Sequence, residues 1–67
     1  MRLRIRDLRE YADLTQTQVA QALSCDQPLY SKYERGERAL PLDLAVKLAE
    51  LYQVSLDYLV GRSDKKD

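Results

Sequence analysis

The chain has 67 residues, enough for one small domain, and 45% are hydrophobic and 33% charged, a balance too apolar for intrinsic disorder. Lysine plus arginine (11) equals aspartate plus glutamate (11), so the formal net charge is zero, which argues against nucleic-acid binding through overall charge alone. One cysteine and no histidine exclude an internal disulfide and the common zinc sites. No run of apolar residues approaches the length of about 20 that crosses a bilayer, so we expect a cytoplasmic protein without membrane contact.

The first predicted helix spans about Leu3 to Ala12. Its apolar stripe is expected to consist of Leu8, Tyr11 and Ala12, which recur at helical spacing, while the arginines occupy other faces. These arginines suit two interpretations equally well, namely contact with flanking phosphates or a solvated charged face.

A second helix is predicted to begin after Thr15, because Thr15 and Gln18 form a capping box in which two end amides are satisfied reciprocally. Its buried stripe is expected to be Val19, Ala20 and Leu23. Ser24 to Asp26 interrupts the pattern, and Cys25 is expected to be a small buried apolar residue.

A third helix of about two turns is predicted from Gln27 to Tyr33, with Asp26 as its N-cap. Pro28 falls in the first turn, where its missing amide hydrogen costs little, and Gly36 supplies a left-handed stop. Tyr30 and Tyr33 share one side of this helix. We expect them to be core residues rather than platforms on which single-stranded bases stack.

Two further helices complete the predicted core. The fourth follows Leu40 and Pro41, and its inward residues are expected to be Leu44, Leu48, Leu51 and Tyr52. Ser55 offers a cap for a short fifth helix, whose core residues are expected to be Leu56, Leu59 and Val60. The predicted domain covers residues 1–61, and a polar, frayed tail covers residues 62–67.

The segment from Gln16 to Arg35 forms a recognisable unit of a helix, a three-residue break and a second helix too short to be stable alone. Small Ala20 lets the two helices approach, and the tyrosines dock the later helix on its scaffold. The opposite face of that helix is thereby directed toward solvent. A short helix held in this way fits the roughly 12 Å major groove of DNA.

From about Ile5 to Asp64 the sequence resembles the phage repressor and Cro family of helix-turn-helix regulators. The matching pieces are Leu14-Thr15-Gln16 before Val19-Ala20, Tyr30 through Gly36, Lys47-Leu48-Ala49, and Val54 through Leu59. The resemblance implies an all-α fold, a compact five-helix lambda-repressor-like DNA-binding domain whose second and third helices form the helix-turn-helix. Ser24 stands where many relatives have glycine, so the turn is expected to carry left-handed strain or to adopt a different geometry.

The resemblance also implies a set of site residues. Base edges are expected to be contacted by Gln27, Pro28, Leu29 and Lys32, and phosphates by Gln16, Thr17, Ser31, Arg35 and Arg38. Chemistry supports part of this set, because Gln27 suits adenine and Lys32 suits guanine or a phosphate. By analogy with similar proteins, Arg9 and Glu34 are expected to form a structural ion pair.

Together these observations predict a sequence-specific double-stranded DNA-binding regulator, a repressor, that is not an enzyme and needs no cofactor, metal or small-molecule ligand. One domain reads few base pairs, so a homodimer on palindromic half-sites about 34 Å apart is expected. The candidate dimer contacts are Tyr52, Tyr58 and Val60, which alternatively complete the core. The rival interpretation is a protein-interaction module of the same fold, an antitoxin or anti-repressor partner without specific DNA binding, which the zero net charge favours slightly.

Overall fold

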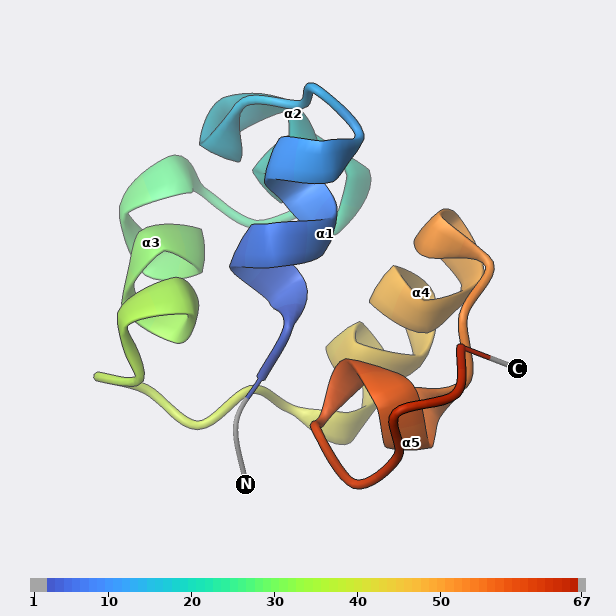
Figure 1. Cartoon of the computed structure of the whole chain (residues 1–67). Helices are drawn as coiled ribbons and strands as arrows, with labels where there is room; N and C mark the ends of the chain where they lie inside the picture. The colour runs from blue at the N-terminus through green and yellow to red at the C-terminus, as the bar shows by residue number, and fades with distance from the viewer. Residues whose placement is uncertain (1–2, 67) are drawn as a thin grey trace.

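The computed structural model describes residues 3–66, and within them the chain forms five helices and no strand. The helices are α1 (Ile5–Tyr11), α2 (Gln16–Ala22), α3 (Gln27–Arg35), α4 (Leu42–Tyr52) and α5 (Leu56–Leu59). Residues 1, 2 and 67, which belong to the predicted domain and tail, lie outside the described residues. In Figure 1, α1 lies between the α2–α3 pair and the α4–α5 pair. Because the described residues form helices only, the all-α prediction is confirmed.

Side-chain caps mark where α2, α3 and α5 begin. Thr15 and Gln18 make both bonds of the predicted capping box, with distances of 2.8 and 3.1 Å. Asp26 accepts a hydrogen bond of 2.8 Å from the backbone amide of Leu29, and Ser55 Oγ accepts one of 3.0 Å from Tyr58. The three predicted helix starts are confirmed, because each cap satisfies an amide that the helix itself leaves unpaired.

Left-handed residues end the helices and set the turns. Gly36 closes α3 with a φ of 75°, as its sequence position predicts. Ser24, in the turn between α2 and α3, has a φ of 59°, so the expected left-handed strain is present at a residue that has a Cβ. Asp13 and Gln53 adopt the same region without having been predicted to do so.

The core takes one fully buried large side chain from each helix: Ile5, Val19, Tyr30, Leu48 and Leu59. The buried stripe Val19, Ala20 and Leu23 and the burial of Tyr30 and Tyr33 are confirmed. Each helix thus buries its apolar face against the others, which offsets the entropy of ordering short helices that would not persist alone.

Four predicted core positions are wrong. Tyr11 is 85% exposed and Ala12 is exposed, because α1 ends at Tyr11 and meets the other helices through Ile5 at its opposite end. Leu51 is 44% exposed, since α4 turns Ala45, Leu48 and Ala49 inward and leaves Leu51 at the edge of that stripe. Cys25 is half-buried beside the core rather than inside it.

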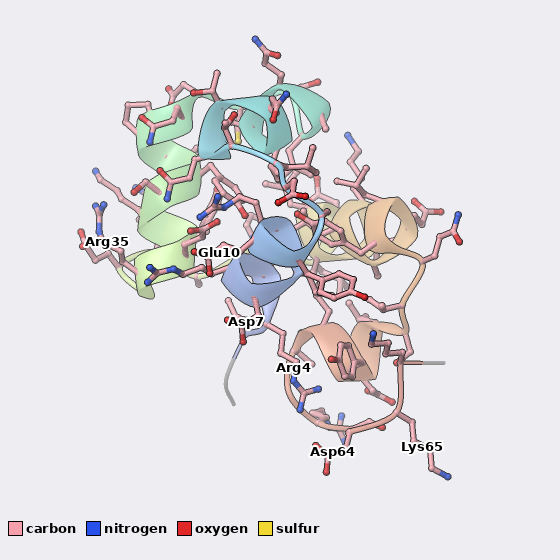
Figure 2. The ribbon with its side chains drawn as sticks, turned by 45° about the horizontal axis from the view of Figure 1, so that its top comes forward. Arg4, Asp7, Glu10, Arg35, Asp64 and Lys65 are labelled. Carbon is pink, nitrogen blue, oxygen red and sulfur yellow. The ribbon has the colours of Figure 1, made fainter. Side chains whose placement is uncertain are left out.

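Arg4 fastens the start of the described chain to its end. Its backbone amide donates to the Leu59 carbonyl at 2.8 Å, and its guanidinium donates to the carbonyls of Tyr58 and Ser63 at 2.9 and 2.6 Å. The guanidinium also contacts Asp64 at 3.0 Å and lies 4.1 Å from the centre of the Tyr58 ring. Figure 2 shows Arg4 and Asp64 together. Residues 63 and 64 of the predicted tail therefore contact Arg4, which has a structural role.

Candidate nucleic-acid interface

The third helix presents two different faces. Tyr30, Ser31 and Tyr33 are buried, with 0%, 8% and 5% of their surfaces exposed. Pro28 and Lys32 are exposed, while Gln27 and Leu29 are half-buried. Because α2 and α3 pack against each other, the exposed face of α3 is held at a fixed angle to the rest of the molecule.

An ion pair joins α1 to the end of α3. Arg9 Nε lies 2.6 Å from Glu34 Oε2 and Arg9 Nη2 lies 3.3 Å from Glu34 Oε1, so the two side chains expected to pair do lie together. Arg9 also donates to the Leu14 carbonyl at 2.9 Å, which ties α1 to the loop before α2. Only 3% of the Glu34 side chain and 13% of the Arg9 side chain are exposed.

The environment keeps both members of this pair charged. Burial opposes ionisation of Glu34, but hydrogen bonds from Arg9 and Gln16 outweigh it, so the pKa of Glu34 lies below its ordinary value. The hydrogen bond to Glu34 likewise raises the pKa of Arg9. Glu34 is therefore a carboxylate at neutral pH, and a carboxylate can only accept hydrogen bonds.

Two glutamines continue the contacts from this carboxylate to the surface. Gln16 Nε2 donates to Glu34 Oε1 at 3.0 Å, and Gln16 Oε1 accepts from Gln27 Nε2 at 2.6 Å. Gln16 is the first residue of α2 and Gln27 the first of α3. The sequence reasoning placed both residues at a DNA interface but missed this connection. Its only sequence signal is the glutamine at the start of each helix.

Two tyrosine hydroxyls lie buried near the ion pair. Neither Tyr30 Oη nor Tyr52 Oη has a hydrogen-bond partner among the described residues. Burial raises the pKa of Tyr52 to about 12, and burial together with nearby Glu34 raises that of Tyr30 further. Both hydroxyls therefore stay neutral, and they contribute packing rather than charge to the site.

The cationic side chains near α3 differ in whether they form an ion pair. Arg35 Nη1 donates to Ser31 Oγ at 2.6 Å, and Arg35 Nε lies 2.5 Å from the Glu37 carboxylate. Lys32 and Arg38 are exposed, and within residues 3–66 neither has an ion-pair partner. Ser31 was predicted to contact phosphate, yet it is buried and its hydroxyl accepts from Arg35.

The remaining predicted site residues are spread over the surface and the core. Thr17 is exposed in the first turn of α2, while Leu29 is half-buried and packs against the core. The candidate dimer contacts, Tyr52, Tyr58 and Val60, are all half-buried. The large apolar side chains that the structure does expose are Tyr11, Leu42, Val46 and Leu51.

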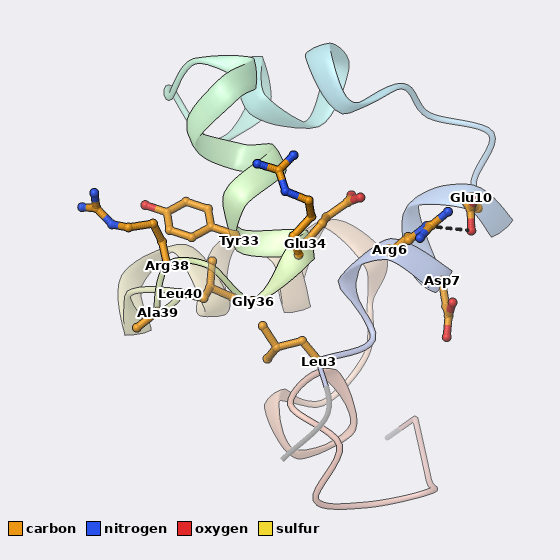
Figure 3. Close-up of a pocket in the computed structure, with 11 residues that line it drawn as sticks. Leu3, Arg6, Asp7, Glu10, Tyr33, Glu34, Gly36, Arg38, Ala39 and Leu40 are labelled. Carbon is orange, nitrogen blue, oxygen red and sulfur yellow. Dashed lines mark ion pairs between the residues drawn. The ribbon is translucent and has the colours of Figure 1, made fainter.

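A cleft of about 560 Å³ lies between α1 and the end of α3, and Figure 3 shows Arg38 and the ion-paired Arg6 and Glu10 on its opposite sides. Its lining mixes both signs of charge, so it offers no concentrated attraction for an anion. Within the described residues no group of three or more His, Cys, Asp or Glu side chains is placed to hold a metal ion. None of the helices there is long and apolar enough to cross a membrane.

Comparison with known proteins adds a family to this geometry. Residues 5–59 match the protein family described as helix-turn-helix. The uncharacterized HTH-type transcriptional regulator YobD of Bacillus subtilis is 41% identical over 64 residues, which cover 96% of this chain and 57% of that protein. Among solved structures, none matches the chain significantly.

Two further relatives are named as regulators. The HTH-type transcriptional regulator ImmR of Bacillus subtilis is 38% identical over 61 residues, 91% of this chain and 48% of that protein. The cryptic phage CTXphi transcriptional repressor RstR of Vibrio cholerae is also 38% identical over 61 residues, 91% of this chain and 55% of that protein. The chain spans about half the length of these relatives. With its five helices and its α2–turn–α3 unit, the chain belongs to the helix-turn-helix family of phage repressor and Cro type, which confirms the resemblance.

Proposed function

We propose that this chain is a sequence-specific double-stranded DNA-binding transcriptional regulator, a repressor that occupies its operator with α3 in the major groove. The observation that carries the proposal is the placement of Gln27. It stands half-buried at the start of α3, and its amide nitrogen donates to Gln16 Oε1 at 2.6 Å. A polar group held in this way is suited to reading a base edge.

Base reading is assigned to the exposed side of α3. Gln27 uses one amide hydrogen on Gln16, and its second hydrogen and its oxygen match N7 and N6 of adenine. Lys32 is exposed and suits guanine O6 and N7. Pro28 offers apolar contact to a thymine methyl, whereas Leu29 divides its surface between the core and the groove.

Phosphate binding is assigned to groups that flank α3. Arg38 and Thr17 are exposed, and Gln16 retains one amide hydrogen beyond its bond to Glu34. Arg35 has to exchange its Glu37 partner for a phosphate, and its bond to Ser31 keeps it in place for that exchange. Ser31 thus acts through Arg35 in this proposal. These contacts position the protein on DNA without reading sequence.

The finer features of the proposal concern assembly. One α3 reads only a few base pairs, so we propose that two copies bind palindromic half-sites about 34 Å apart. Tyr58 and Val60, half-buried on and beside α5, are the proposed contacts, and Tyr52 joins them at the end of α4. Sedimentation of the chain with and without its selected duplex measures the stoichiometry. Binding of one copy per duplex at every concentration would contradict the proposed dimer. The proposed place of action is the cytoplasm.

Selection from randomised duplex DNA at two salt concentrations tests the proposal. We expect an enriched palindromic sequence whose binding weakens steeply with salt. Selection without any enriched sequence would favour the rival function, a protein-interaction module of the same fold. The Arg35–Glu37 pair is the observation on the side of that rival, because it neutralises a cation near α3.

Two variants separate base reading from phosphate binding. Gln27→Ala should cost roughly 1–3 kcal/mol on the selected site and relax one base position. Arg38→Ala should weaken all sequences alike and reduce the slope of log affinity against log salt by about 0.9. Lys47→Ala, which removes a cation from the exposed part of α4, is the matched control and should change neither quantity. Equal losses on every sequence for Gln27→Ala and Arg38→Ala would show that base reading is misassigned.

A further inference from the structure

A continuous chain of side-chain hydrogen bonds leads from α1 to the first residue of α3. Arg9 donates to both Glu34 oxygens, Gln16 donates to Glu34 Oε1, and Gln27 donates to Gln16 Oε1. The chain begins at a guanidinium, which only donates, and passes through a carboxylate, which only accepts. The two glutamine amides that follow have one donating end and one accepting end each.

The carboxylate removes an ambiguity that a glutamine amide otherwise has. Turning an amide over exchanges its oxygen and nitrogen at almost no steric cost, so its partners decide the orientation. Glu34 accepts only, hence Gln16 has to turn Nε2 toward it. Gln16 Oε1 then faces Gln27, and Gln27 has to donate to it through Nε2. Each orientation follows from the one before it.

We propose that Glu34 is a positioning residue for base reading, which sets through Gln16 the order in which the Gln27 amide presents its donor and acceptor to DNA. This inference rests on the proposed function, because it concerns how α3 reads a base. It gives Glu34 a role that an ion pair for stability alone does not require. The low exposure of the Glu34 side chain, 3%, supports the proposal, since little of the carboxylate is accessible to competing water.

The consequence for recognition lies in the direction of the amide. In the arrangement observed, Gln27 keeps its oxygen and one amide hydrogen for the base. Turning the amide over would exchange the positions of the acceptor and the donor along the groove. Base pairs differ in the order of these groups in the major groove, so the exchange would favour a different base pair.

Glu34→Gln tests the inference because it should reverse the donor–acceptor order of these hydrogen bonds rather than merely weaken them. The oxygen of the new amide is needed by Arg9 Nε, whose bond to Oε2 is the shorter one, so the amide nitrogen would face Gln16. Gln16 and then Gln27 would have to turn over. In selection from randomised duplex DNA, we expect one base pair of each half-site to change identity, with the original base losing roughly 5-fold or more in relative preference.

A second variant should restore the original reading. In Glu34→Gln combined with Gln16→Glu, the new carboxylate at position 16 accepts both from the amide at position 34 and from Gln27 Nε2. Gln27 would regain its original orientation, and the selected base pair should return to that of the wild type. Overall affinity should fall uniformly, because a carboxylate at position 16 repels phosphates. A purely structural role for Glu34 predicts no such return.

The control is Glu50→Gln, which removes the same charge from an exposed position of α4 and should leave the selected sequence unchanged. If the single variant does not fold, as judged by circular dichroism, Gln16→Met decides the matter. It cuts the chain of hydrogen bonds while leaving the Arg9–Glu34 pair intact, and preference at that one base pair should drop to near equality. An unchanged base preference in Glu34→Gln, or in Gln16→Met, would overturn the inference. Failure of the wild type to enrich any sequence would overturn the proposed function instead.

Discussion

The α2–α3 half and the α4–α5 half of this small fold are held together in different ways. In the first, a charged pair and two glutamines lie among the packed helices, and the Glu34 side chain is 3% exposed. In the second, the buried residues of the helices are apolar, namely Ala45, Leu48, Ala49 and Leu59, and the polar contacts of Arg4 lie at the chain ends.

The difference follows from what each half has to do. Apolar burial stabilises a fold but has no preferred direction. Hydrogen bonds have direction, so they determine where a side chain points as well as whether it is held. The half that presents Gln27 therefore uses buried polar groups, although apolar residues of equal volume would often give similar or greater stability.

Removing the partner of the buried carboxylate should have the largest effect on the free energy of unfolding. Arg9→Met leaves Glu34 buried without a counter-charge, at a cost of about 3–5 kcal/mol. The whole domain has on the order of 3–10 kcal/mol of stability, so partial unfolding at neutral pH is expected. Denaturant unfolding followed by circular dichroism measures the change.

Arg6→Met is the control for this variant. Arg6 lies on the same helix, but its pair with Glu10 spans 3.7 Å and both side chains are more than half exposed. Its loss should change stability by less than about 0.5 kcal/mol. Similar losses of stability for Arg9→Met and Arg6→Met would mean that the buried ion pair contributes no more to stability than the exposed one.

A cavity in the α4–α5 half should have the next largest effect. Leu48 is 0% exposed, and Leu48→Ala should cost about 2–5 kcal/mol through lost burial and an unfilled volume. Leu42→Ala, on the same helix but 69% exposed, should cost much less. A cost for Leu48→Ala below about 1 kcal/mol would contradict the apolar account of this half.

Acid should weaken the α2–α3 half selectively. The folded pKa of Glu34 lies below its ordinary value of 4.5, so its contribution is present above that value and disappears as pH falls through the folded pKa. Glu34→Gln should therefore unfold with a shallower dependence on acid than the wild type, whereas Leu48→Ala should keep the wild-type dependence. Denaturant midpoints between pH 7 and pH 3 measure both, and identical acid slopes for all three proteins would refute the assignment.

The smallest predicted effect is a gain. Ser24 has a φ of 59°, and Ser24→Gly should stabilise the protein by about 0.5–1 kcal/mol, because relief of left-handed strain exceeds the added freedom of the unfolded chain. Gln53→Gly in the other half, at a φ of 56°, should gain a similar amount. Thermal unfolding checks both, and a loss confined to Ser24 would indicate a contact made by its side chain.

The sequence by itself determined the local features. Thr15, Asp26 and Ser55 begin helices and Gly36 ends one, because capping depends only on groups within a few residues. The helical spacing of apolar residues also indicated the buried faces of α2 and α3. These features suffice for the all-α fold and for the helix-turn-helix.

Only the tertiary structure decided what depends on distant contacts. The contact between Arg4 and the tail and the hydrogen bonds from Glu34 through Gln16 to Gln27 join residues that are 11 to 60 positions apart. The exposure of Tyr11 depends on where the helices meet. Helical periodicity says which residues share a face, but not which face finds a partner. Likewise a glutamine's identity supplies a donor and an acceptor, while their direction is set by neighbours that only the packed fold brings within reach.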